Sequence, residues 1–143
     1  MIYWILSAFL GVLVLINSPL RHDVQVQEQQ QQSPLTLRAI QTVRYMNLIN
    51  DWRYDNPDFP DGVVSDSTLD WTAVPGLQNL IAAGRTWVYQ PSQPGLMTSL
   101  LSQTRQSALV GHVVNRRLID SQGNDMKVSV PDNIANDSLV WLN

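Results

Sequence analysis

The chain has 143 residues, which is enough for one ordinary domain with a short appendage. Only 15 % of the residues are charged and the net charge is −3, so a basic nucleic-acid-binding surface is not expected. The absence of cysteine excludes disulfide scaffolds, zinc–cysteine sites, iron–sulfur clusters and thiol nucleophiles. His22 and His112 are the only histidines, which leaves little material for metal or acid–base chemistry.

Residues 1–20 contain no charged side chain and are mostly apolar. As a helix rising 1.5 Å per residue, this stretch would span roughly 30 Å, the thickness of the hydrocarbon core of a bilayer. Tyr3 and Trp4 at one end are typical of the membrane–water boundary, and Pro19 and Arg21 mark the other end. We therefore predict a single transmembrane helix over residues 1–20.

Two other interpretations of this stretch are open. A cleaved secretory signal would carry a basic n-region, but the chain has neither Lys nor Arg before the apolar run. A buried core helix would show a polar face, which this segment lacks. An uncleaved anchor fits the residues best. Arg21, taken alone, weakly favours the cytoplasmic side for the residues that follow it.

Residues 21–33 are polar and rich in glutamine, so they are predicted to form a linker. Ser33 and Pro34 then fit the N-cap and the first position of a helix that ends before Pro57. Apolar side chains recur along it every three residues, which predicts an amphipathic helix packed on its own domain's sheet, with a partner-binding helix as the alternative. The recurring residues are Leu37, Ile40, Val43, Met46, Ile49 and Trp52.

The remaining chain predicts short helices and strands. Helices are expected over residues 77–83, with Gly84 as C-cap, and over residues 96–104. The strand patterns cover residues 85–90, 108–114, 117–120, 126–130 and 138–142. The short spacing of the strands from residue 108 onwards predicts an antiparallel sheet of about four strands, and the expected fold class is α+β.

The sequence shows no catalytic constellation. It has no G-x-S-x-G elbow and no glycine-rich phosphate loop. His112 lies inside a predicted strand and is expected to be a packed histidine. The acidic turn at residues 55–62 lacks the ligand spacing of an EF-hand and is expected to be a solvated loop. We therefore predict no enzymatic activity, no cofactor and no metal.

Aromatic residues offer more information about binding. The predicted domain contains Trp52, Trp71, Trp87 and Trp141, which either fill the core or anchor an interface. The first choice for a partner surface is the segment of residues 89–97, because two prolines hold it stiff. Its candidate interface residues are Tyr89, Pro91, Pro94, Leu96 and Met97.

Short strings spread over the chain carry a resemblance to a known family. They are residues 85–91 (RTWVYQP), 94–96 (PGL), 107–111 (SALVG) and 138–143 (SLVWLN), preceded by the apolar and glutamine-rich stretches. Together they resemble the small PilM family of type IVB (thin) pilus biogenesis proteins. The actin-like PilM of type IVa pili is a different, larger protein that this chain does not resemble.

The resemblance implies a bacterial inner-membrane protein, inserted through residues 2–20, whose α+β domain lies in the periplasm. On this basis we expect a transmembrane anchor at 1–20, a linker at 21–33 and a periplasmic domain at 34–143. The expected role is a non-enzymatic pilus biogenesis component, in conjugation among other settings. Expected partners are the platform protein, secretin-associated proteins or pilin; a second copy of the chain is left open, and no nucleic acid is expected. The alternatives are a minor pilin and a membrane-tethered hydrolase.

Overall fold

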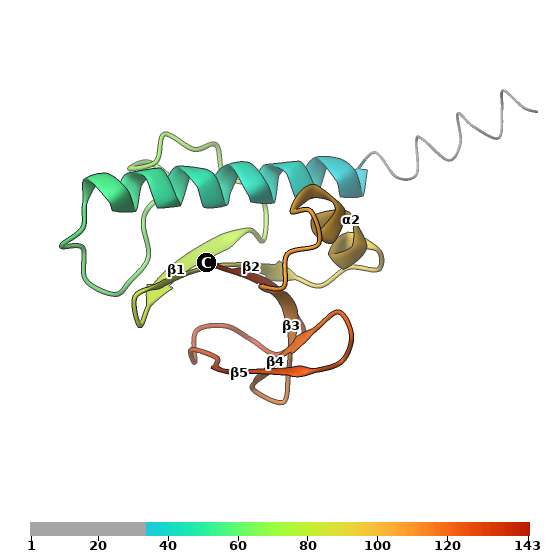
Figure 1. Ribbon diagram of the computed structural model, residues 1–143. Coiled ribbons are helices and arrows are strands. Elements are labelled where there is room, and N and C mark those ends of the chain that lie inside the picture. The colour runs from blue at the N-terminus through green and yellow to red at the C-terminus, as the bar shows by residue number, and fades with distance from the viewer. Residues whose placement is uncertain (1–33) are drawn as a thin grey trace, which may run out of the picture. The chain divides into compact units, whose positions relative to one another are not determined.

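The computed structural model describes residues 34–143 (Figure 1). Within this range, Leu35–Asn143 belong to one compact unit. The predicted transmembrane anchor at 1–20, the predicted linker at 21–33 and the predicted Ser33 N-cap lie outside the described residues. In residues 34–143, no helix is both long and apolar enough to span a bilayer.

The described residues form two helices and six strands. The long helix covers residues 34–55 and ends before Pro57, as predicted. The other elements are β1 (Gln78–Ala82), β2 (Arg85–Pro91), α2 (Leu96–Gln103), β3 (Val110–Val114), β4 (Arg117–Asp120), β5 (Asp125–Ser129) and β6 (Ser138–Leu142). All strand pairs are antiparallel, in the order β1-β2-β6-β3-β4-β5. The predicted α+β class is confirmed, but the sheet has six strands rather than about four.

The helix predicted over residues 77–83 is wrong, because this segment is strand β1. It pairs with β2 from Gln78 opposite Tyr89 to Ala82 opposite Arg85. Ala83 and Gly84, with φ of 52° and 74°, form the two-residue turn between the strands. Positive φ at both central residues is type I′ geometry, which suits a tight hairpin. Gly84 therefore closes a hairpin and does not cap a helix.

The buried face of the long helix differs from the predicted stripe. Leu37 is 55 % exposed, whereas Met46 and Ile49 are buried. Leu37 and Met46 are nine positions apart, and at about 100° per residue they lie on opposite sides of the helix. A strict three-residue repeat therefore drifts around the helix. The residues that the structure buries are Ala39, Thr42, Tyr45, Met46 and Ile49.

Both faces of the sheet carry apolar clusters. Figure 1 shows the long helix across one side of β1 and β2, where Met46 and Ile49 pack near Ile81 and Val88. On the other side, β4 and β5 lie beneath the first strands. Leu80, Trp87, Val113, Leu118, Ile134, Val140 and Leu142 share a single cluster there. Since these residues come from both halves of the strand order, the sheet must curl on itself.

Gly111 in β3 lies where the strand closely approaches its neighbour β4. A Cβ atom at this position would lie 2.7 Å from the carbonyl oxygen of Ile119 and 3.0 Å from Sδ of Met126. A Cβ–oxygen distance of 2.7 Å is shorter than any ordinary contact, and the carbonyl oxygen belongs to the backbone of β4. Glycine inside a strand commonly marks such a close approach. The close pairing of β3 with β4 therefore requires a residue without a side chain at position 111.

Candidate interaction site

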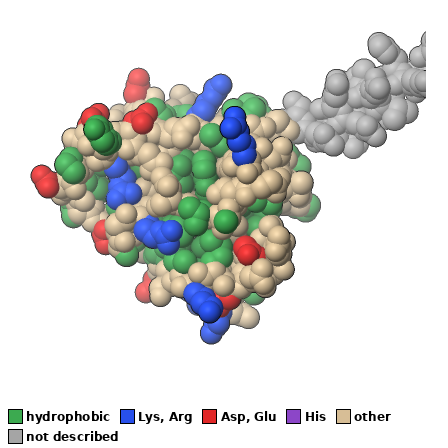
Figure 2. Space-filling model, in the orientation of Figure 1, with side chains coloured by type: hydrophobic (Ala, Val, Ile, Leu, Met, Phe, Trp, Pro, Cys, Tyr) green, Lys and Arg blue, Asp and Glu red, His purple; other side chains and the backbone are tan. Residues whose placement is uncertain are grey.

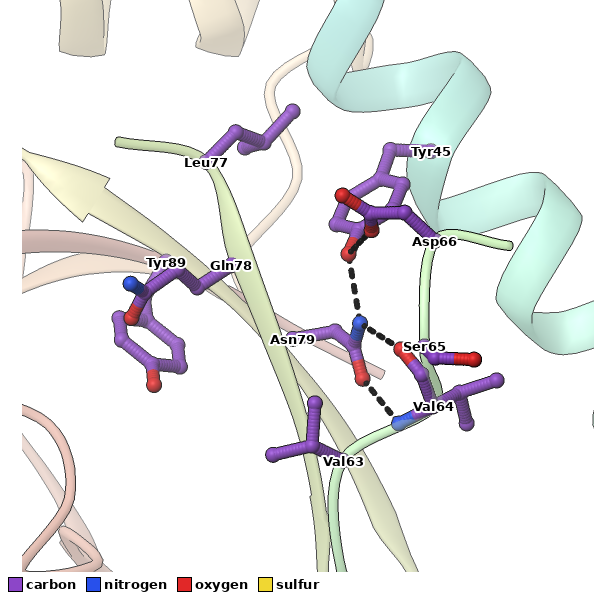
Figure 3. Close-up of a pocket in the computed structure, with 9 residues that line it drawn as sticks. All are labelled: Tyr45, Val63, Val64, Ser65, Asp66, Leu77, Gln78, Asn79 and Tyr89. Atoms are coloured by element: carbon purple, nitrogen blue, oxygen red, sulfur yellow. Dashed lines mark hydrogen bonds between the residues drawn. The ribbon is translucent and has the colours of Figure 1, made fainter. Parts of the chain in front are cut away.

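A cavity of about 360 Å³ opens between the long helix, the segment 63–66 and the start of β1 (Figure 3). Tyr45 contributes from the helix, Asp66 from the segment, and Asn79 from β1. The segment reaches this position because Gly62 pairs with Ile81 through two backbone hydrogen bonds of 2.8 Å. The exposed edge of β1 is therefore partly covered.

Asn79 links the segment 63–66 and the long helix to β1 at the wall of the cavity. Its side-chain amide accepts a hydrogen bond from the Val64 nitrogen at 2.9 Å and donates to the Val64 carbonyl at 2.8 Å. The same Nδ2 donates to the Tyr45 hydroxyl at 2.5 Å, and Tyr45 donates to Oδ1 of Asp66 at 2.9 Å. Asn79 is only 2 % exposed, so a buried polar side chain finds all its partners here. Figure 3 shows this network on the wall of the cavity.

The electrostatics of the cavity favour hydrogen bonding over proton transfer. Burial raises the pKa of the Tyr45 phenol to about 12; the bond from Asn79 opposes this shift and the Asp66 carboxylate adds to it. Burial also raises the pKa of Tyr89. Both phenols therefore stay protonated near neutral pH, and the Tyr45 hydroxyl donates to Asp66. The residues that line the cavity include one carboxylate, Asp66, and no Lys, Arg or His.

The candidate interface predicted at residues 89–97 divides into core and surface positions. Tyr89 is 9 % exposed and Leu96 is 0 % exposed, so both belong to the core. Leu96 is buried because α2 begins there and turns it into the cluster of Ala39 and Leu100. The remaining three, Pro91, Pro94 and Met97, are exposed or partly exposed and stay a predicted interface.

The base of this loop is fixed to the long helix. Gln90, which is 2 % exposed, accepts a hydrogen bond from Nε of Arg38 at 2.6 Å and donates to the Thr42 hydroxyl at 2.9 Å. Arg38 also donates to the Pro75 carbonyl at 2.6 Å. The loop that follows Gln90 therefore starts from a rigid support, which lowers the entropy lost when a partner binds.

His112 lies in β3 and is partly buried, between Gly111 and Val113. Among residues 34–143, the salt bridges join Arg116 to Asp132 and Arg117 to Asp125, and none involves His112. The described part of the chain also contains no group of three His, Asp or Glu side chains placed to hold a metal ion. The expectation that the chain has no catalytic, cofactor or metal residue stays a prediction.

Sequence reasoning missed the polar residues of the core. Thr42, Tyr45, Asn79 and Gln90 are all buried and all join the helix to β1 or β2. One spacing pattern in the sequence could have revealed the buried face of the long helix. Ala39, Thr42, Met46 and Ile49 follow the i, i+3, i+7 and i+10 spacing of a helix face, but only if threonine is accepted as a core residue.

Comparisons with known proteins agree with the resemblance carried by the short strings. The PilM family matches residues 7–142. A crystal structure of a protein named PilM from Escherichia coli B7A is 34 % identical, with a TM-score of 0.69 over 80 % of this chain and 94 % of that chain. Another, a protein named pilM from Pseudomonas aeruginosa 2192, is 27 % identical, with a TM-score of 0.45 over 73 % of this chain and 90 % of that one. No curated protein matches. The chain therefore belongs to the PilM family, as one of its small, pilus-related members and not as the actin-like protein of the same name.

Proposed function

We propose that this chain is a non-enzymatic component of a type IVB pilus biogenesis machine, anchored in the bacterial inner membrane by residues 1–20. In this proposal residues 34–143 form a periplasmic domain that docks other assembly proteins, including in conjugation. The partner classes are the platform protein, secretin-associated proteins and pilin.

Family membership over residues 7–142 is the observation that carries the proposal. The matched range includes most of the uncharged N-terminal stretch together with the folded domain, so both belong to one family pattern. The E. coli protein that shares the fold carries the PilM name as well. These findings support a role with other pilus proteins, and the length and apolarity of residues 1–20 support the anchor.

Anchoring supplies a simple physical mechanism. A domain held at the membrane by a short linker is confined to a thin layer, which raises its effective concentration towards neighbouring membrane components. Contacts that are weak in free solution then suffice for assembly. The stiff loop with Pro91, Pro94 and Met97 offers one such contact, because its backbone is already ordered before a partner arrives.

Three variants of the N-terminus test the anchor. Deleting residues 2–20 should abolish piliation. Replacing residues 1–20 by a cleavable secretory signal releases the domain into the periplasm, and this variant should also fail because the tether is missing. Replacing them by an unrelated single-pass helix should restore pili. Immunoblots confirm equal amounts of each protein. Normal pili from the released domain would contradict the proposal.

Topology and processing can be measured directly. Alkaline phosphatase fused after Asn143 should be active, because the enzyme matures only outside the cytoplasm. Mass spectrometry of the native protein should find an intact N-terminus. A mature chain starting at Val12 would instead indicate a minor pilin, since that start follows Gly11 as a prepilin cleavage would. An inactive fusion would place the domain in the cytoplasm and contradict the proposed location.

A further inference from the structure

A second cleft lies at the C-terminal end of the long helix. It has a volume of about 350 Å³ and is lined by Trp52, Asp55, Asn56, Pro57, Asp58 and Phe59; we call it the Trp52 cleft. Trp52 and Phe59 meet edge to face, with ring centroids 4.8 Å apart, and both rings keep part of their surface exposed. Asn56 holds the turn by donating from Nδ2 to the Trp52 carbonyl at 2.8 Å. The apolar floor therefore has a defined shape.

The surroundings of this cleft carry unbalanced negative charge. Residues 51–70 contain a single basic residue, Arg53, against the aspartates at positions 51, 55, 58, 61, 66 and 70. Arg53 donates to the Thr86 hydroxyl at 2.7 Å and to the Gly84 carbonyl at 3.1 Å, so its guanidinium faces the β1–β2 hairpin. Figure 2 shows acidic side chains at the end of the domain where the long helix finishes. Within residues 34–143, neither Asp55 nor Asp58 forms a salt bridge.

The aspartates on the helix work against local stability. Asp51 and Asp55 are exposed and lie in the last two turns of the long helix. The C-terminal end of a helix carries partial negative charge, which disfavours acidic residues and favours cations. No contact within the described residues explains why these positions are acidic. Residues that disfavour their local structure, as acidic residues do at a helix C-terminus, are usually found where function requires them.

From these observations we propose that the Trp52 cleft binds a basic segment of a partner protein in the pilus machine. An arginine or lysine side chain lies with its alkyl stem and cation against Trp52 and Phe59, and its charge is held by Asp55 and Asp58. The aromatic faces, the two carboxylates and the helix C-terminus all favour a cation in this position. That the partner belongs to the pilus machine rests on the proposed function. The preference of the cleft for a cation does not rest on it.

The two surfaces of the domain are separate. A Cβ atom on Gly95 would lie 3.1 Å from the Leu35 side chain, so the loop after β2 meets the N-terminal part of the long helix. The Trp52 cleft lies at the opposite end of the same helix, roughly 30 Å away for about twenty residues at 1.5 Å each. Occupation of one surface therefore leaves the other accessible.

Photocrosslinking in piliated cells tests the proposal. A photoreactive residue replaces Tyr54, which is 88 % exposed and lies on the helix beside the cleft. The peptide crosslinked to it should contain lysine or arginine. D55N/D58N should lower the yield at least about fivefold, because the asparagines keep the shape and remove the charge. D132N/D137N changes the net charge equally on the loop before β6 and should leave the yield unchanged. A crosslink to a second copy, or one that D55N/D58N does not weaken, would overturn the proposal.

A titration with a defined probe gives an independent measurement. The full-length chain in neutral detergent is titrated with dye-labelled, end-capped penta-arginine at about 50 mM salt, with capped penta-glutamate as the negative probe. D55N/D58N should raise Kd about tenfold and D132N/D137N less than twofold, and about 0.3 M salt should remove most of the difference. Equal Kd values for the two variants, or tighter binding of penta-glutamate, would exclude the cleft as the basic-segment site.

The two proposals fail in different ways. If the anchor variants leave piliation intact while penta-arginine binding still depends on Asp55 and Asp58, the pilus role is wrong and the basic-segment site stands. If the anchor is required but D55N/D58N changes neither the crosslink nor Kd, the inference about the Trp52 cleft is wrong and the membrane-anchored role stands.

Discussion

The Asn79 side chain takes the place of a backbone partner for Val64. Its side-chain amide makes with Val64 the donor and acceptor bonds that a backbone partner would make, and it adds a third bond to Tyr45. Asparagine is normally depleted in strands, so its position in β1 reflects this tertiary task and not its propensity. The cavity wall, the edge of the sheet and the long helix are joined at this one residue.

Tyr45 gives a prediction at the same scale. Burial raises its pKa to about 12 in the folded protein, against about 10 in the unfolded chain. The unfolded state therefore loses its proton first, and the free energy of unfolding should fall as pH rises from 10 to 12, by on the order of 1–2 kcal/mol. The contribution is fully present below pH 10. Urea denaturation at several pH values measures this slope.

Matched variants identify the source of the slope. Tyr45→Phe removes the phenol and should flatten the dependence, leaving a smaller part for Tyr89, whose pKa burial also raises. Tyr54→Phe removes a phenol that is 88 % exposed and should keep the full slope. An unchanged slope in Tyr45→Phe would mean that the buried hydroxyl does not control stability at high pH.

At the scale of elements, β3 pairs with β4 and leaves no room for a side chain at Gly111. The two strands meet through a turn at Asn115 and Arg116, which have φ of 49° and 65°. Arg116 then donates to the carbonyls of Ile134 and Pro131 and ties the loop before β6 to this hairpin. The second apolar cluster therefore depends on close backbone packing as much as on its apolar side chains.

Gly111→Ala tests this packing. The new Cβ would meet the Ile119 carbonyl oxygen at 2.7 Å, so the strands must separate, and we expect a loss of about 2–3 kcal/mol in the free energy of unfolding. Gly123→Ala is the control, because a Cβ there meets nothing within 4 Å and only the positive φ of 85° is strained. That variant should lose about 1 kcal/mol. Urea denaturation measures both losses. Equal losses of unfolding free energy in the two variants would show that β3 has room for a side chain at position 111.

At the scale of the whole molecule, stability should be graded across the sheet. β2 and β6 lie between neighbours on both sides, whereas β5 is an edge strand. Its pairing with β4 is irregular between Arg117 and Ile119, and Lys127 has a φ of 55°. Bulges of this kind protect an edge from pairing with other chains. The same irregularity leaves β5 with fewer cooperative hydrogen bonds.

Amide hydrogen exchange on the full-length chain measures this gradient. The amides of β2 and β6 should exchange slowest, with opening free energies close to that of global unfolding, and those of β5 should exchange at least about tenfold faster. The relevant comparison is between Val140 in β6 and Val128 in β5, which carry the same side chain. Equal protection of the two valines would contradict the strand order.

The sequence by itself determined the elements whose signals are local. The long helix ends before Pro57 and α2 begins at Leu96, both as predicted. Short family strings along the chain were also enough to indicate PilM membership.

Only the tertiary structure decided β1, the curl of the sheet and the burial of Thr42, Tyr45, Asn79 and Gln90. The physical reason is the same in each case. A strand needs a hydrogen-bonding neighbour and a buried polar side chain needs a partner, and both come from residues far away in the chain. The negative charge beside the Trp52 cleft likewise depends on the direction of the Arg53 side chain, which is set by Thr86 and Gly84 on a distant hairpin.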